Sequence, residues 1–187
     1  MPFIAVQTLL TLRSLYFVSA RLGHNAFSQY TFVYLTSIDI LSNYPVQAEA
    51  FLREIRPTEF GRIPEHPHER NYDLFFLNTA EHFTLSLPSS VNEDLLIGAA
   101  SPYLGTGNDS NLVEIFEAAH SVILSALTAP QNSDLTNKYL RFYADVLFKV
   151  RSAFSMAVVL LSNKLFRRFP KVFLRASSVW LSRLSSE

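Results

Sequence analysis

One segment, residues 112–127, constrains the fold more than any other, because its apolar side chains recur at helical spacing for four turns. Positions i, i+3, i+4 and i+7 lie on one face of an α-helix, so this pattern predicts a helix with a continuous apolar stripe. Asn111 and Glu114 have the spacing of a capping box at its start, and Pro130 is expected to end it. The stripe consists of Leu112, Ile115, Phe116, Ala119, Val122, Ile123, Ala126 and Leu127.

Three helices are predicted in the N-terminal third of the chain. Residues 4–22 are apolar at almost every turn and predict a largely buried helix that ends near Gly23. Residues 26–42 predict a second helix, although their β-branched and aromatic side chains also suit a strand. Pro45 favours the first position of a third helix, which is expected to reach Ile55.

The middle of the chain is predicted to contain a loop, two helices and a turn. A loop over residues 56–70 is expected because the segment holds Pro57, Gly61, Pro64 and Pro67. Residues 71–86 resume a helical pattern. Ser90 and Glu93 have capping-box spacing and predict a helix that ends before Pro102, and a turn follows at residues 105–109.

A final helix is predicted to begin near Ser133, and the chain as a whole is predicted to be all-α. The helices are joined by short loops without alternating strands, which favours an irregular helical stack or a solenoid-like bundle of about six to eight helices. No repeat of fixed length is evident, so the solenoid interpretation rests on the pairing of helices. The last helix is expected to bury Tyr139, Tyr143, Val146, Leu147 and Val150.

Composition excludes several classes of protein. Apolar residues make up 49% of the 187-residue chain, which is too many for a disordered segment. Cysteine is absent, so disulfides, thiolate chemistry and thiolate-bound zinc are excluded. The N-terminal sequence lacks the basic region and cleavage site of a signal peptide. The chain contains no uncharged apolar stretch of about 18 residues, so a membrane-spanning helix is not expected.

Charge divides the chain into two predicted parts. Residues 1–150 carry 9 Lys and Arg against 15 Asp and Glu, a net charge of −6, and are predicted to form a helical interaction domain. Residues 151–187 carry 7 basic residues and one acidic residue, a net charge of +6. These 37 residues are expected to form a basic amphipathic helical tail that could lie on an anionic membrane surface. The alternative is that the tail is not native to the fold and reflects an altered gene model or splice form.

Glu117 and His120 have the Glu-x-x-His spacing that supplies metal ligands in di-iron helical bundles. Such a site needs a second copy of the motif and two further glutamates, and the sequence has one copy. A metal-dependent enzyme built on this pair is therefore the weakest of three hypotheses. The competing interpretation places both side chains on the solvent-facing side of the helix, opposite the apolar stripe.

Other polar motifs are interpreted as structural. His66 and His68, flanked by Glu65 and Glu69, could bind a divalent metal, but a solvated loop is the favoured interpretation. Adjacent residues on a helix point in different directions, so Glu81 and His82 are not expected to form an acid–base pair.

Two motifs of the turn at residues 105–109 are likewise discounted. Gly105-Thr106-Gly107 lacks a preceding strand and a third glycine and is interpreted as a turn, and Asn108-Asp109-Ser110 is a glycosylation triplet without a sign of secretion. No nucleophile with its base and orienting group stands out, so no catalytic residue, cofactor or metal site is predicted.

Five segments carry a resemblance to a known family. The longest reads RNYDLFFLNTAEHFT, at residues 70–84, and together the segments cover about residues 1–150. They resemble the fungal intraperoxisomal peroxin family, peroxin-8. The matching segments are residues 34–41, 45–49, 70–84, 99–104 and 112–122.

This resemblance implies a scaffold in the import of peroxisomal matrix proteins rather than an enzyme. The implied protein lies on the lumenal side of the peroxisome, peripheral to the membrane. It links the docking and RING-finger subcomplexes and helps cargo leave the import receptor. These proteins are the implied partners, together with a peripheral membrane contact, and no nucleic acid or small-molecule substrate is implied.

Two features depart from the family. Its members are much longer than this chain, and they tend to end in a peroxisomal address of the Ser-Lys-Leu type, whereas this sequence ends Ser185-Ser186-Glu187. Direct targeting through that signal is therefore not expected. The remaining hypothesis, from another class, is a peripheral membrane-surface protein that binds through its basic tail.

Overall fold

The computed structural model describes residues 1–22, 28–107 and 109–153, and within these ranges every regular element is a helix. The predicted all-α fold is therefore confirmed, including the helical interpretation of the second element. The long helices are α1 (Pro2–Leu22), α2 (Ser28–Ser42), α3 (Pro45–Ile55), α4 (Pro67–Ala80), α7 (Val113–Thr128) and α8 (Ser133–Ala153). The short ones are η1 (Glu81–Phe83), α5 (Ser89–Val91), η2 (Asn92–Ile97), α6 (Gly98–Ala100), η3 (Ser101–Tyr103) and η4 (Pro130–Asn132).

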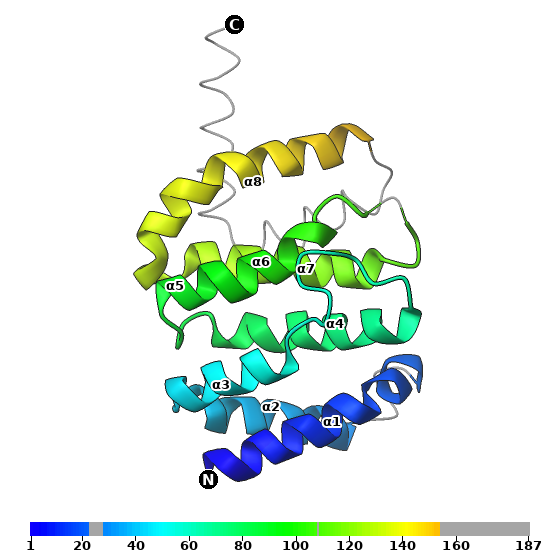
Figure 1. The fold of residues 1–187 in the computed structure, drawn as a ribbon, viewed down its shortest axis with the longest axis vertical. Helices are drawn as coiled ribbons and strands as arrows, with labels where there is room; N and C mark the ends of the chain where they lie inside the picture. The colour runs from blue at the N-terminus through cyan, green and yellow to red at the C-terminus, as the bar shows by residue number, and fades with distance from the viewer. Residues whose placement is uncertain (23–27, 108, 154–187) are drawn as a thin grey trace, which may run out of the picture.

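The helices are stacked in layers along the long axis of the molecule (Figure 1). Helices α1 and α2 pack against each other and form the layer at the N-terminal end. Helices α3 and α4 follow, α7 packs on the other side of α4, and α8 packs on α7 at the opposite end. The short helices from α5 to η3 lie beside α7 in the same layer. Each inner layer is thus covered from two sides.

Helix α7 is the centre of the core. All eight residues of the apolar stripe predicted from the sequence are buried, so this prediction is confirmed. The burial extends well beyond the stripe, because Ala118, Ser121, Leu124 and Ser125 are buried as well. A helix buried around most of its circumference must be packed by neighbours on several sides. Helix α4, the α5–η3 segment and α8 supply that packing.

The start of α7 differs from the expected capping box. Leu112 occupies the N-cap position, and no side chain bonds to the free backbone amides there. Oδ1 of Asp109 accepts a hydrogen bond of 2.8 Å from the backbone N–H of Asn111. Asn111 is therefore part of a local turn that precedes the helix. The prediction that Asn111 and Glu114 cap the helix is therefore wrong.

The capping box predicted at Ser90 and Glu93 is also wrong. The helical segment begins two residues earlier than predicted, at Ser89, because Pro88 is extended and occupies the N-cap position in place of Ser90. Ser90 therefore lies inside the first turn, and the Glu93 carboxylate bonds to α8 instead. The segment contains a π-helical stretch, η2, and its last α-helical residue is Ala100, before Pro102 as predicted. The 3₁₀ helix η3 follows directly.

The predicted loop over residues 56–70 is shorter than expected. Helix α4 begins at Pro67, because proline is well tolerated at the first helical position, where its missing N–H has no intrahelical partner. The loop is therefore confined to residues 56–66, where Gly61 adopts a φ of 82°. Pro45 occupies the corresponding first position of α3, as predicted.

The C-terminal helix begins at Ser133, as predicted, and runs through residue 150, where the charge of the sequence changes sign. Tyr143 is fully buried, whereas Tyr139, Val146 and Leu147 are partly buried. The side chain of Val150 and most of the predicted basic tail lie outside the described residues. Within the described ranges, no helix is long and apolar enough to cross a membrane.

The buried position of Phe116 gives a test of α7 as the core helix. Its ring is 3% exposed and packs edge-on to His120. Replacing Phe116 with Ala should lower the free energy of unfolding by about 3–5 kcal/mol, because a cavity replaces the ring. Urea denaturation measures this change, and Phe142→Ala in α8 is the matched control because Phe142 is 49% exposed. Equal destabilisation by the two substitutions would contradict the central position of α7.

Candidate functional site

The most buried polar group singled out by the sequence, His120, lies in the interior of the protein. Its side chain is fully buried, whereas Glu117 is half-buried. The prediction that both residues lie on a solvent-facing side of the helix is therefore wrong for His120. At about 100° per residue, His120 falls within about 60° of Phe116, Ile123 and Leu127 around the helix axis. It therefore belongs to the apolar stripe itself.

The hydrogen bonds of His120 indicate which ring nitrogen carries the proton in the neutral side chain. Nε2 lies 3.3 Å from the carbonyl oxygen of Leu104, and Nδ1 lies 2.8 Å from the hydroxyl oxygen of Tyr143. A carbonyl can only accept, so Nε2 carries the proton and Nδ1 accepts from the hydroxyl of Tyr143. Burial lowers the pKa of His120 to about 4, although the bond to Leu104 opposes this shift. The imidazole is therefore neutral near pH 7 and joins α7, α8 and the residue after η3.

A second buried polar pair joins α4 to η3. The hydroxyl of Tyr103 donates a 2.6 Å hydrogen bond to Oδ2 of Asp73, and both residues are nearly inaccessible to solvent. Burial raises the pKa of Asp73 to about 6, while the hydrogen bond from Tyr103 acts in the opposite direction. Burial and the neighbouring carboxylate also raise the pKa of Tyr103. The pair is therefore a neutral phenol that donates to a carboxyl group titrating close to neutral pH.

Polar contacts also join the N-terminal layer to α4. The Asn78 side-chain amide donates to the hydroxyl oxygen of Tyr16 at 2.9 Å. The hydroxyl groups of Tyr34 and Thr79 lie 2.9 Å apart. Helices α1 and α2 are thus each connected to α4 by a tyrosine hydroxyl. These directional contacts favour one lateral position of the layers, because apolar packing alone specifies position less sharply.

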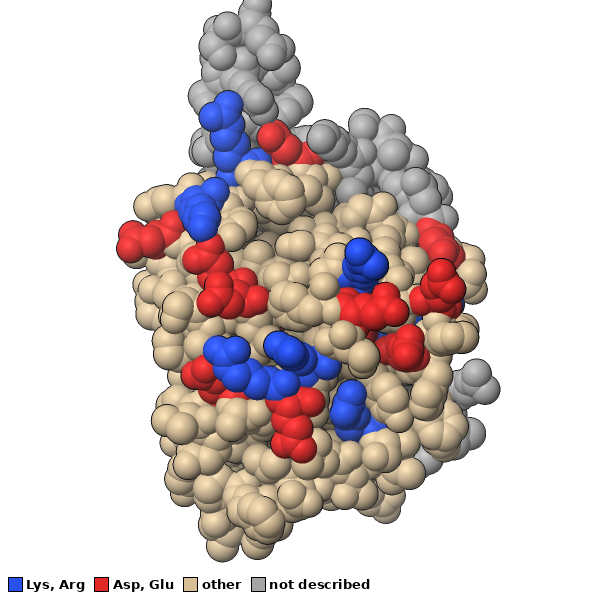
Figure 2. Space-filling model, viewed as in Figure 1, with Lys and Arg blue, Asp and Glu red and all other residues tan. Residues whose placement is uncertain are grey.

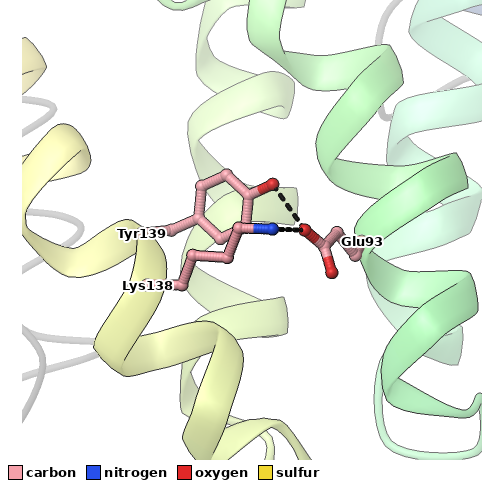
Figure 3. A network of polar contacts seen from close by, with 3 residues as sticks. All are labelled: Glu93, Lys138 and Tyr139. Carbon is pink, nitrogen blue, oxygen red and sulfur yellow. Dashed lines mark hydrogen bonds and ion pairs between the residues drawn. The ribbon is translucent and has the colours of Figure 1, made fainter.

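A third cluster joins η2 to α8 (Figure 3). Oε1 of Glu93 accepts hydrogen bonds from the Lys138 ammonium and, at 2.7 Å, from the Tyr139 hydroxyl. These hydrogen bonds lower the pKa of Glu93. Lys138 is exposed, so water screens its ion pair with Glu93 and the pair contributes little to stability. The cluster helps to position α8 on the stack.

The remaining motifs from the sequence are dispersed. His66 is exposed and precedes α4, and His68 is exposed and contacts the rings of Tyr72 and Phe17. His82 is exposed and lies near the ring of Tyr34. Gly105 and Gly107 lie in the turn before α7, as predicted, and Asn108 lies outside the described residues. Among the described residues, no group of three or more His, Asp or Glu side chains is arranged to hold a metal ion.

The arrangement of these polar groups is suited to holding helices together. His120, Asp73 and Tyr103 are each shielded from solvent and hydrogen-bonded to another part of the chain. A general acid or base must instead reach the proton of a bound substrate. The shifted pKa values of His120 and Asp73 therefore have a structural cause, which is burial between layers, and do not indicate a reactive centre.

Asp73 and Tyr103 were not among the functional residues predicted from the sequence, although one signal was present. Asp73 lies one helical turn before Leu77 and two before Ala80. It therefore shares a helix face with apolar residues that are expected to be buried. A carboxylate at such a position requires a hydrogen-bonding partner. The identity of that partner, 30 residues later in the chain, depends on the fold.

Comparison with known proteins supports a likeness to peroxins. Residues 48–128 match the family model of the PEX8 central TPR-like domain, a range that begins in α3 and ends with α7. The chain is also 29% identical over 155 residues to the peroxisomal membrane protein PEX17 of Yarrowia lipolytica. That alignment covers 75% of this chain and 23% of the relative, so the chain spans about a quarter of the relative's length. No solved structure matches the chain.

The two matches confirm the predicted resemblance at the level of peroxins. One match is to PEX8 and the other to PEX17, so a specific assignment to the peroxin-8 family remains a proposal. The family-model match covers α4 and α7, the Asp73–Tyr103 pair and His120. Tyr143, Lys138 and Tyr139 on α8, and Tyr16 and Tyr34 in the N-terminal layer, lie outside the matched range.

Asp73 and His120 make opposite contributions to the pH dependence of stability. The pKa of Asp73 is raised from 3.8 to about 6, so its contribution to stability is lost as the pH rises through 6. The pKa of His120 is lowered from 6.5 to about 4, so its contribution is lost as the pH falls through 4. Between about pH 4 and 6, rising pH therefore lowers the stability contributed by Asp73 and raises the stability contributed by His120.

Replacing Asp73 with Asn should expose the contribution of His120. The amide oxygen still accepts from Tyr103, but the titration is gone, so stability should rise by up to about 1.4 kcal/mol per pH unit between pH 4 and 6. Urea denaturation at several pH values gives this slope. Asp94→Asn, at an exposed position of η2, is the matched control and should leave the wild-type profile unchanged. Parallel profiles for wild type and Asp73→Asn would refute the assignment.

Proposed function

We propose that this chain acts as a non-enzymatic helical scaffold in peroxisome biogenesis, in the import of matrix proteins. The observation that carries the proposal is the match of residues 48–128 to the PEX8 central TPR-like domain. In the structure this range contains the central helices of the stack, from α3 to α7. The likeness therefore falls on the core of the described domain rather than on a peripheral segment.

The physical properties of the stack agree with this role. Parallel layers of helices expose long surfaces on their sides and ends, which suits contacts with other proteins. The polar groups buried between the layers, His120 and Asp73 among them, are engaged in holding the layers in position. A scaffold needs this rigidity, since it must present two binding surfaces at a fixed separation.

The proposed partners are the peroxisomal import receptor and the proteins of the docking and RING subcomplexes. The proposed position is the lumenal side of the peroxisome, peripheral to its membrane. Both statements follow from the resemblance to peroxin-8, and the chain spans only 23% of its PEX17 relative. The role proposed for this chain is therefore the bridging step, in which one scaffold contacts two subcomplexes.

A bridging assay tests the proposed function. A purified docking protein is immobilised, a soluble RING-subcomplex protein is added, and its recovery is measured with and without the full-length chain. We expect recovery to require the chain and to saturate as its concentration rises, because a bridge needs both contacts at once. An unrelated helical protein of similar size is the control, and recovery no greater than with that protein would contradict the proposal.

A further inference from the structure

The loop between α3 and α4, residues 56–66, crosses the side of the stack, and we call it the strap. In Figure 1 it leaves the end of α3, reaches the layer of α6 and returns to the start of α4. Pro57 and Pro64 are buried and Ile63 packs against the core, whereas residues 58–62 are exposed. In Figure 2, charged side chains of both signs lie over the layers where Figure 1 places the strap. The strap is therefore a surface segment with an apolar underside.

One aromatic ring fastens the middle of the strap to the layer of α6. Phe60 lies over Gly98, the first residue of α6, and a Cβ atom at residue 98 would lie 2.8 Å from Cζ of the ring. Carbon atoms in contact lie about 3.5–4.0 Å apart, so the ring occupies space that only a glycine leaves free. The rest of the ring meets solvent, because Phe60 is 43% exposed. The contact is therefore at the surface rather than in the core.

The backbone of the strap adds little to this fastening. Between residues 57 and 65 it forms one backbone–backbone hydrogen bond, from the N–H of Arg62 to the carbonyl oxygen of Glu59 at 3.1 Å. Gly61 turns the chain at this point with a φ of 82°. Segments with few buried apolar contacts and few hydrogen bonds open at a lower free energy than the core. The strap can therefore open while the helices on both sides of it stay packed.

The strap lies next to the buried pair of Asp73 and Tyr103. Gly98, on which Phe60 rests, precedes Tyr103 by five residues in the same helical segment. Glu59, the neighbour of Phe60, is close enough to Asp73 to act on its carboxyl group electrostatically. Because Glu59 and Phe60 are exposed while Asp73 and Tyr103 are buried, the strap lies on the solvent side of the pair.

The closed strap opposes ionisation of Asp73 in two ways. Burial is the largest cause of the raised pKa of Asp73, and the hydrogen bond from Tyr103 acts in the opposite direction. Glu69 on α4 and Glu59 on the strap raise this pKa further, whereas Arg13 on α1 lowers it. The strap thus keeps water from the carboxyl group and also carries one of the two like charges that act on it.

The helices around Asp73 leave its ionised form without a close cation. Arg13 of α1 lies outside ion-pair distance, and Arg53 of α3 is paired within its own helix. His120 of α7 is neutral above its pKa of about 4. A buried carboxylate without a paired cation is unfavourable, and contact with water stabilises it. Opening the strap brings water to Asp73 and moves Glu59 away from it.

We propose that the strap is a pH-sensitive cover, closed while Asp73 is protonated and released as its carboxyl group ionises. The pKa of this group is about 6 in the closed state, against an ordinary value of 3.8 for a carboxyl group in water. Between pH 5 and 7.5 this difference should raise the ratio of open to closed strap about tenfold. Release exposes Gly98 and the inner side of the Phe60 ring on one side of the stack. This device goes beyond the proposed scaffold role and does not depend on it.

The reactivity of a thiol placed under the strap measures its opening, since the natural chain contains no cysteine. Pro64→Cys places the thiol at a buried position, and Thr58→Cys places one at an exposed position of the same loop. The rate of reaction with dithiodipyridine is measured for both full-length chains between pH 5 and 7.5. The ratio of the two rates removes the ionisation of the thiol itself, so we expect the ratio to rise about tenfold with pH.

Two substitutions in these chains connect the opening to Asp73 and to Phe60. Asp73→Asn keeps an acceptor for the hydroxyl of Tyr103 and should make the ratio independent of pH. Gly98→Ala should raise the ratio at every pH, because the added Cβ displaces the ring of Phe60. Circular dichroism checks that both variants remain folded.

Glu59→Gln tests the charge on the strap without a change in the core. It should make the rise with pH smaller, because it removes a like charge that opposes ionisation of Asp73. Glu65→Gln, at another exposed position of the strap, is the matched control and should leave the rise unchanged. A ratio that stays constant with pH in the natural background, or a rise that Asp73→Asn leaves intact, would overturn the proposal. Equal effects of Glu59→Gln and Glu65→Gln would do the same.

Discussion

Burial of α7 on almost every side is the constraint on which the remaining structure depends. A helix that is apolar around most of its circumference cannot lie at the surface, so it requires neighbours on several sides. Helix α4 covers one side, α8 another, and the short helices from α5 to η3 a third. Once α7 is enclosed, α4 is itself an inner layer and needs α1, α2 and α3 on its far side. The layered arrangement thus follows from one helix outward.

Apolar packing brings the layers together, but it specifies their lateral positions poorly. Buried hydrogen-bonded pairs set these positions, because hydrogen bonds are directional. Asp73 with Tyr103 and His120 with Tyr143 each join parts of the chain that are distant in sequence. Both pairs place a titratable group in the core, and burial favours the neutral form of each group. Burial of the two groups therefore costs least where Asp73 is protonated and His120 is neutral, which is between about pH 4 and 6.

The sequence predicted the elements that depend on a strong local pattern. The stripe of residues 112–127, the proline at the first position of α3 and the all-α class each follow from spacing or backbone geometry. The helix starts at Ser89 and Val113 did not follow. Glu93 bonds to α8, far away in the sequence, and Asp109 forms a local turn with the backbone of Asn111 in place of the expected cap. His120 was predicted to face solvent because its side chain is polar, although its position on the helix places it in the apolar stripe.

The two ends of the stack differ, and this difference connects the fold to the proposed scaffold role. The outer sides of α1 and α2 expose large apolar side chains such as Phe3 and Phe32, whereas exposed charged residues such as Lys138 and Arg141 lie on α8. The two ends therefore offer different surfaces to partner proteins. A scaffold that joins two partners can use one surface for each, provided that the layers between the two ends are rigid.

The rigidity of those layers depends on α7, and amide hydrogen exchange under native conditions tests it most directly. If α7 is the enclosed centre, its amides should exchange only through global unfolding and be the slowest in the chain, while amides of α8 exchange through local opening. Exchange in α7 that is as fast as in α8 would show that α7 is not the element on which the other layers depend.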